Sequence, residues 1–144
     1  MKTLQTNFGE VQYDPERVVH FPEGLIGFEH LRDFVVLPNE QNEVLFCLQS
    51  VEEADVAFLL INPGIFFPDY QFDLSESTLH KLGISHEDPS FIPTTSTFHQ
   101  YRQVTLNLLA PVVYTPKTDR ALQILLDNSG YQAKTPLPPE HISP

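Results

Sequence analysis

The sequence predicts a mainly β protein, a small antiparallel β-barrel or sandwich-like single domain with one short helix. Thirteen prolines among 144 residues leave little room for long helices, because proline lacks an amide proton and breaks helix interiors. Short apolar or alternating runs recur between turn residues, which is typical of antiparallel sheets. We expect residues 1–131 to form one β-rich domain and residues 132–144 to form a mobile C-terminal tail.

The expected strands are short runs rich in β-branched and aromatic residues. They span 4–13 (two strands around Gly9), 18–21, 34–37, 44–50, 56–61, 91–98, 104–108, 112–114 and 122–126. The runs at 44–50 and 56–61 are continuously apolar, which indicates central strands buried on both faces. Pro93 places the strand at 91–98 near an edge, and the alternation at 104–108 leaves one face of that strand wet.

The connections between these strands also carry signals. The loop FPEGLIGF at 21–28 contains Gly24 and Gly27, which accept backbone angles that other residues resist. We expect one helical turn at 29–33. The only clear helix spans 76–82, with Leu79 and Leu82 on one face and Gly83 as its C-terminal cap; either Asp73 or Ser75 caps its start.

The charge and cysteine content limit the classes of function. Nineteen acidic residues against eight basic ones give a net charge of -11, which disfavours direct nucleic-acid binding and favours encounter with a basic protein. The single cysteine, Cys47, forms no intrachain disulfide and lies in a predicted core strand. Because the sequence shows no apolar leader and no membrane-spanning run, we expect a cytoplasmic protein that does not contact a membrane.

No reaction chemistry is visible in the sequence. The six histidines show no metal-binding spacing, and neither a nucleophile elbow nor a phosphate-binding loop is present. We therefore predict no catalytic residues, no metal and no cofactor. The alternative is a small hydrolase or ligand-binding β-barrel whose mouth brings together separated groups such as His20 or His99 with carboxylates.

The aromatic segment 61–74, INPGIFFPDYQFDL, is the strongest candidate for a binding site. If the segment is extended, Phe66, Pro68, Tyr70 and Phe72 share one face, which we interpret as core. The other face then holds Phe67, Asp69, Gln71 and Asp73, so Phe67, Asp69 and Asp73 become candidate partner contacts. The alternative is an irregular segment after Pro63 and Gly64, with Phe67 folded into the core.

A second candidate is the acidic link between the two apolar runs. Glu52, Glu53 and Asp55 place three carboxylates within four positions. Such a link is typical of a solvated turn, and its exposed charges are also candidate contacts for a basic partner.

Several stretches together resemble the flagellar assembly factor FliW family. They are HFPEGLIGFEH at 20–30, FCLQSVEEADVAFLLINP at 46–63, FFPDYQFDL at 66–74 and LNLLAPVVYT at 106–115, and the resemblance runs from about Phe8 to Leu137. It implies a small β-barrel-like protein without enzymatic activity. It also implies two exchanging partners, flagellin and the RNA-binding translational repressor CsrA, which the family antagonises away from the RNA-binding surface. A flagellin chaperone that does not engage CsrA is a third reading.

Overall fold

The computed structural model describes residues 1–6, 9–38, 44–98 and 103–138, which form a mainly β protein. The strands in this part of the chain are β1 (Lys2–Thr6), β2 (Gly9–Tyr13), β3 (Val19–His20), β4 (Asp33–Pro38), β5 (Leu45–Ser50), β6 (Ala57–Ile61), β7 (Thr94–Phe98), β8 (Val104–Leu106), β9 (Val112–Thr115), β10 (Arg120–Gln123) and β11 (Thr135–Pro136). The helical elements are η1 (Pro15–Arg17), η2 (Pro63–Ile65) and α1 (Glu76–Leu82). The predicted fold class is confirmed.

Nine of these strands form one sheet, and β1 pairs with β2 as a separate hairpin. The order in the large sheet is β11-β8-β7-β6-β5-β4-β3-β10-β9, so the predicted central position of β5 and β6 is confirmed. The pairs are antiparallel except one, because β10 pairs parallel with β3 through Arg120 and His20. The prediction of a purely antiparallel sheet is wrong at this point. Strands β4 to β9 lie between β3 and β10 along the sequence, and the chain then returns so that β10 lies beside β3.

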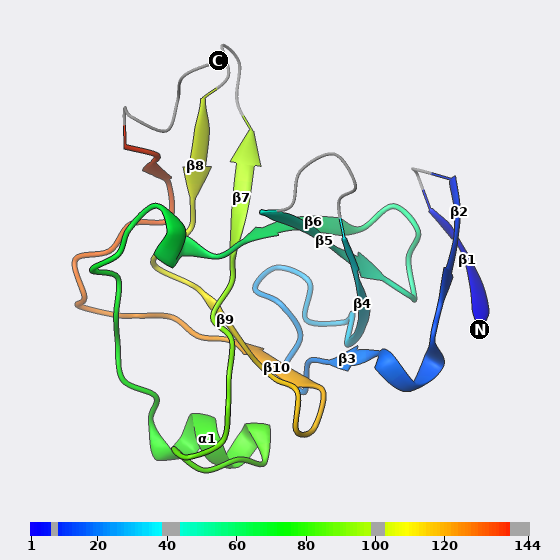
Figure 1. Cartoon of the computed structure of the whole chain (residues 1–144), viewed down its shortest axis with the longest axis horizontal. Helices are drawn as coiled ribbons and strands as arrows, with labels where there is room; N and C mark the ends of the chain where they lie inside the picture. Colours follow the sequence, from blue (N-terminus) through cyan, green and yellow to red (C-terminus); the bar gives the residue numbers. More distant parts are fainter. Residues whose placement is uncertain (7–8, 39–43, 99–102, 139–144) are drawn as a thin grey trace.

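The large sheet curls so that its β9 end approaches the chain leading into β7 (Figure 1). Phe91 and Tyr114 exchange two backbone hydrogen bonds of 2.8 and 2.9 Å, and Val112 N donates to Pro93 O at 2.9 Å. These contacts attach β9 to residues 91–93 without a continuous ladder. The result is a barrel-like curl with one weakly fastened seam.

The main hydrophobic core fills the inside of this curl. Its buried residues come from six strands and the loop after β3: Val19, Phe21, Leu25, Leu31, Phe34, Leu48, Leu60, Val112 and Ala121. Phe21 and Phe34 meet edge to face with 5.2 Å between ring centroids, a favoured aromatic geometry. The pairing of β5 with β4 on one side and with β6 on the other therefore aligns the inward residues of three strands against one another.

A second core cluster ties the C-terminal part of the chain to the sheet. It contains Leu45, Ile61, Leu106, Leu108 and Leu137. β11 pairs with β8, so residues 135–137 belong to the packed structure although the sequence placed them in a tail. Residues 139–144, the last six of the tail expected at 132–144, lie outside the described residues. The mobility of these six residues stays a prediction.

The helix α1 spans the predicted residues and packs with Leu79 and Leu82 inward. Ser75 is its N-cap and accepts a hydrogen bond from Thr78 N, so the Asp73 alternative is wrong. Gly83 ends the helix in the left-handed conformation and donates to the carbonyls of His80 and Leu79. Both ends therefore follow from local sequence.

The helical turn expected at 29–33 is wrong. The chain makes one turn, in which Leu31 N donates to Phe28 O at 3.0 Å, and β4 begins at Asp33. The next two amides, of Arg32 and Asp33, donate to Glu52 Oε1 instead of to helical carbonyls. A long-range side chain thus competes with local helix formation.

Two glycines in the loop after β3 provide a matched stability test. Gly24 has φ +70° and a methyl group there would lie 2.6 Å from Glu29 Cα, whereas Gly27 has φ +88° and faces open space. Gly27→Ala should cost about 1 to 2 kcal/mol of unfolding free energy for the left-handed backbone. Gly24→Ala should cost about 1 to 3 kcal/mol more, because the backbone of Glu29 must move. Urea unfolding of both variants measures the difference, and equal costs would contradict this description of the loop.

Candidate functional site

The aromatic segment 61–74 leaves β6 and turns instead of continuing as a strand. Asn62 Oδ1 accepts a hydrogen bond from Gly64 N at 3.0 Å and begins η2. Phe66 N and Phe67 N both donate to Pro63 O, and Tyr70 N then donates to Phe67 O at 2.9 Å. The prediction of alternating faces is wrong, because side chains in consecutive turns do not follow the two-residue period of a strand.

Phe67 lies against the second core cluster and is half-buried, like its neighbour Phe66. The expectation of an exposed Phe67 is wrong, and the alternative of an irregular segment with Phe67 turned inward is confirmed. The backbone carbonyl of Pro63 explains this placement, since it accepts from both phenylalanine amides and brings both rings toward β5 and β8. Phe67 still has partial exposure and stays a candidate contact at the margin of the site.

Tyr70 anchors the middle of the segment. Its hydroxyl donates to the carbonyl of Leu108 at 2.7 Å, and its ring meets Tyr131 edge to face with 4.7 Å between centroids. Burial, followed by the neighbouring Tyr131, raises the pKa of Tyr70 above its ordinary value. The phenol therefore stays neutral and remains a donor throughout the physiological range. Phe72 packs against the third cluster beside α1, so the predicted core roles of Tyr70 and Phe72 are confirmed.

The outward side of the segment combines apolar and acidic groups. We call it the segment surface, and its exposed residues are Ile65, Pro68, Asp69, Gln71 and Asp73. Ile65 is 47% exposed although it follows buried Pro63 by only two residues. Sequence reasoning missed Ile65. The available signal was the Asn62-Pro63-Gly64 triplet, which favours a capped turn and so changes which neighbours point outward.

The acidic link between β5 and β6 forms a well-bonded turn. Ser50 Oγ accepts hydrogen bonds from Glu52 N and Glu53 N, each at 3.0 Å. Gln49, fully buried, donates through Nε2 to Ala54 O at 3.2 Å. These contacts hold the turn from inside, so its carboxylates project from a fixed backbone.

The three carboxylates of this turn have different surroundings. Glu52 Oε1 accepts from two backbone amides near the start of β4, and Glu53 Oε1 lies 3.5 Å from His30 Nε2. Asp55 is exposed. In the nearby loop the backbone amides of Glu29 itself and of Gly27 hold the pKa of Glu29 below its usual value. Glu52 therefore has a structural role, and Glu53 and Asp55 are the freer candidates.

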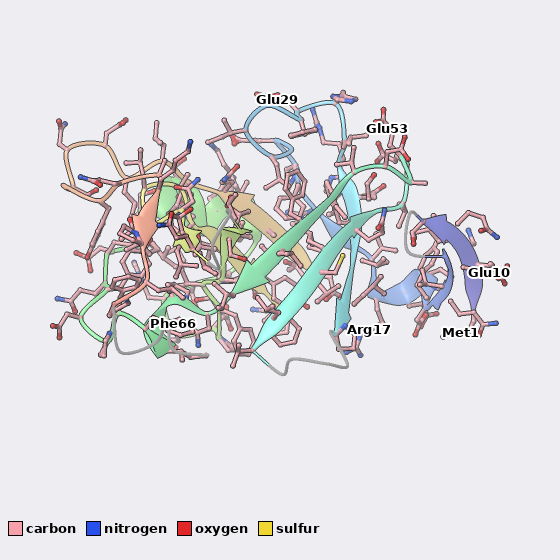
Figure 2. The ribbon with its side chains drawn as sticks, turned by 90° about the horizontal axis from the view of Figure 1, so that it is seen from above. Met1, Glu10, Arg17, Glu29, Glu53 and Phe66 are labelled. Carbon is pink, nitrogen blue, oxygen red and sulfur yellow. The ribbon has the colours of Figure 1, made fainter. Side chains whose placement is uncertain are left out.

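The structure does not bring the two candidate groups together. The acidic turn precedes β6 and the segment surface follows it, so the five residues of β6 separate them. Figure 2 shows Glu53 and Phe66 on opposite edges of the molecule, with Glu29 on the same edge as Glu53. Glu52, Glu53 and Asp55 thus form one candidate surface, and Phe67, Asp69 and Asp73 lie with the other.

The large cavity of the described structure lies at the open mouth of the curl and has a volume of about 700 Å³. Its lining is mainly apolar and includes no histidine. His20 instead pairs with Asp33 at 2.7 Å on the surface, and His99 lies outside the described residues. Among the described residues, no histidine lines this mouth beside a carboxylate as a hydrolase barrel would need.

Within residues 1–6, 9–38, 44–98 and 103–138, no three His, Cys, Asp or Glu side chains are grouped as metal ligands would be. None of the helices in this part of the chain is long and apolar enough to cross a bilayer.

Comparisons with known proteins agree with one another. The family model described as FliW protein matches residues 2–137. The chain is similar to flagellar assembly factor FliW of Syntrophotalea carbinolica, at 50% identity over 137 residues that cover 95% of this chain and 98% of the relative. It is similar to flagellar assembly factor FliW 2 of Desulfotalea psychrophila, at 46% identity over 138 residues that cover 96% and 91%.

A solved crystal structure of the flagellar assembly factor FliW superposes with a TM-score of 0.88 and 31% identity, covering 97% of this chain and 99% of the other. The match therefore extends over almost the whole length of both proteins. The curled sheet, the segment after β6 and the acidic turn all lie inside the matched range. The chain belongs to the FliW family of flagellar assembly factors.

Proposed function

We propose that this chain is a cytoplasmic, non-catalytic regulator of flagellar assembly that binds flagellin and a CsrA-type translational repressor. Its antagonism of the repressor is direct and allosteric, with contact away from the RNA-binding surface. The chain needs no cofactor and contacts neither nucleic acid nor membrane. The observation that supports this proposal most is the FliW family membership, joined to a surface suited to protein contact.

The segment surface has the composition of a protein-binding patch. Ile65 supplies exposed apolar area, and Asp69 and Asp73 add charge at its border. Tyr70 fixes the backbone beneath through its bond to Leu108 O, so little conformational entropy is lost when a partner orders these residues. A rigid apolar patch with a charged rim is typical of interfaces whose affinity is concentrated in a few contacts.

The charge of the chain supports a basic partner. A net charge of -11 produces a field that accelerates encounter with a protein whose surface is basic because it binds RNA. Glu53 and Asp55 project from the acidic turn into that field. The same negative charge repels RNA, which supports binding to the repressor protein and not to the RNA that the repressor recognises.

Direct binding to both partners is the first expected outcome. The purified chain, titrated calorimetrically with a CsrA-type repressor and separately with flagellin, should bind each at micromolar concentration or below. Affinity for the repressor should fall with rising salt, because long-range attraction between opposite charges is screened. Binding to flagellin alone would identify a chaperone that does not engage the repressor. Binding to neither would overturn the proposal.

Reversal of one charge tests the segment surface. Asp69→Lys should weaken one partner about tenfold, equivalent to about 1.4 kcal/mol, with an unchanged unfolding midpoint because Asp69 is exposed. Glu87→Lys makes the same change of charge at another exposed position and is the matched control. Phe67→Ala is a poorer probe, since truncation of this packed ring also removes core contacts. Equal affinities of Asp69→Lys and Glu87→Lys for both partners would remove the segment surface from the interface.

A further inference from the structure

One side of β4 is unpaired over most of its length. β5 pairs with β4 from Phe34 to Pro38, but β3 pairs only with Asp33 and Phe34 on the other side. Upstream of β3 the chain leaves the sheet through η1, so no strand of the described chain continues beside Val35 and the residues after it. Figure 1 shows β4 extending away from β3, with the β1–β2 hairpin standing apart.

The direction of the backbone groups on β4 follows from the hydrogen bonds of Asp33. Asp33 O accepts from Val51 N and Asp33 N donates to Glu52 Oε1, so the groups of Asp33 face the β5 side. Because these directions alternate along a strand, Val36 presents its N–H and C=O to the opposite, unpaired side. Within the described chain, neither group has a hydrogen-bond partner.

The large cavity lies directly beside this free edge. Its lining includes Val35, Val36, Leu37 and Pro38 from β4 together with inward residues of the curl such as Leu48 and Leu60. Gln12 and Tyr13 of the hairpin line it as well. We call this site the β4-edge groove. It is the mouth of the curl extended over the unpaired side of β4.

Four large apolar side chains lining this groove are open to solvent. Met1 is 82% exposed, Val36 45%, Phe46 39% and Phe91 58%. Phe91 stacks on Tyr114 with 6.4 Å between ring centroids and forms a flat wall. Exposed apolar groups gathered around a hollow are typical of a binding surface.

We propose that the β4-edge groove binds an extended, apolar segment of a partner protein, flanked by basic residues, which adds as a strand to β4. An occupant that covers this edge removes water from the N–H and C=O of Val36, and burial without a partner is costly. An extended backbone satisfies both groups, whereas a helix uses its own amides internally.

The chemistry of the occupant follows from the walls. Successive side chains of an added strand would face the mouth of the curl on one side and Leu37 with Tyr13 on the other. Both environments are mainly apolar, which favours apolar residues at consecutive positions. Asp14 and Arg17 are the charged side chains of the lining, and their opposite charges offset each other. The net charge of -11 of the whole chain therefore favours lysine or arginine at the two ends of the bound segment.

Pro38 limits how any strand can add. It supplies a carbonyl to the free side but no amide, so the edge offers one donor and two acceptors over Val36 and Pro38. Proline on an edge is a known restraint on uncontrolled strand pairing. The groove is therefore suited to a short segment whose affinity comes mainly from apolar contacts. This surface is separate from the segment surface, although Asn62 borders both.

The test uses a blocked synthetic peptide, KKVFVIVKK, and two matched peptides. EEVFVIVEE reverses the flanking charge, and KKVFPIVKK removes one central amide. KKVFVIVKK should bind saturably in the micromolar range and slow hydrogen exchange of the Val36 amide at least tenfold. The two matched peptides should each bind at least tenfold more weakly.

Variants of the protein separate backbone pairing from simple apolar contact. Val36→Pro removes the free amide, Val36→Lys places a charge in the mouth, and each should weaken KKVFVIVKK at least tenfold. Val36→Thr keeps the backbone and the β-branched shape, so it should bind within about threefold of the parent. Circular dichroism and unfolding midpoints report whether each variant folds; if Val36→Pro does not fold, Val36→Lys and the exchange measurement decide. Absence of saturation, or saturation without protection of the Val36 amide, would overturn the proposal.

Discussion

The antiparallel pairing of β5 with both β4 and β6 is the constraint on which the rest of the structure depends. The two registers bring Phe34 opposite Ser50 and Leu48 opposite Phe58, so the inner faces of three strands point into one core. A shift of one residue would turn these side chains outward. The same register places the acidic turn at one end of β6 and the segment surface at the other. Both candidate surfaces are thus positioned by backbone hydrogen bonds formed far from their exposed side chains.

Irregular segments in this molecule are held by side chains that reach across the sequence. Glu52 binds the amides at the start of β4, and Tyr70 binds the carbonyl of Leu108, a buried member of the second cluster. Each bond satisfies a backbone group that no ladder pairs, which is why loops of this length remain ordered. As a consequence, Oε1 of the Glu52 carboxylate is already occupied by hydrogen bonds that stabilise the fold. Glu53 and Asp55 are therefore freer than Glu52 to contact a partner.

Features of the fold were predictable from the sequence where they depend on interactions between residues close together along the chain. The helix 76–82 and the central strands were predictable because capping, periodicity and continuous apolar runs act over a few residues. The choice between an exposed and an inward Phe67 was left open, since it depends on one carbonyl, that of Pro63, accepting two amides. The parallel contact of β10 with β3 and the pairing of β11 join distant segments, and no local pattern encodes them. The β4 edge escaped sequence reasoning for the same reason, because an absent neighbour leaves no mark on the strand itself.

The dimensions of the chain bear on how two partners would share it. A standard interface buries about 800 Å² on each protein, a patch about 16 Å in radius if circular. The two ends of β6 are separated by about 14 Å, since each strand residue advances about 3.4 Å. Partners that extend along β6 from the acidic turn and from the segment surface would therefore meet over the strand. Under the proposed function, such partners exclude each other by size, whereas partners confined to the opposite edges of the molecule shown in Figure 2 exclude each other only through a change in conformation.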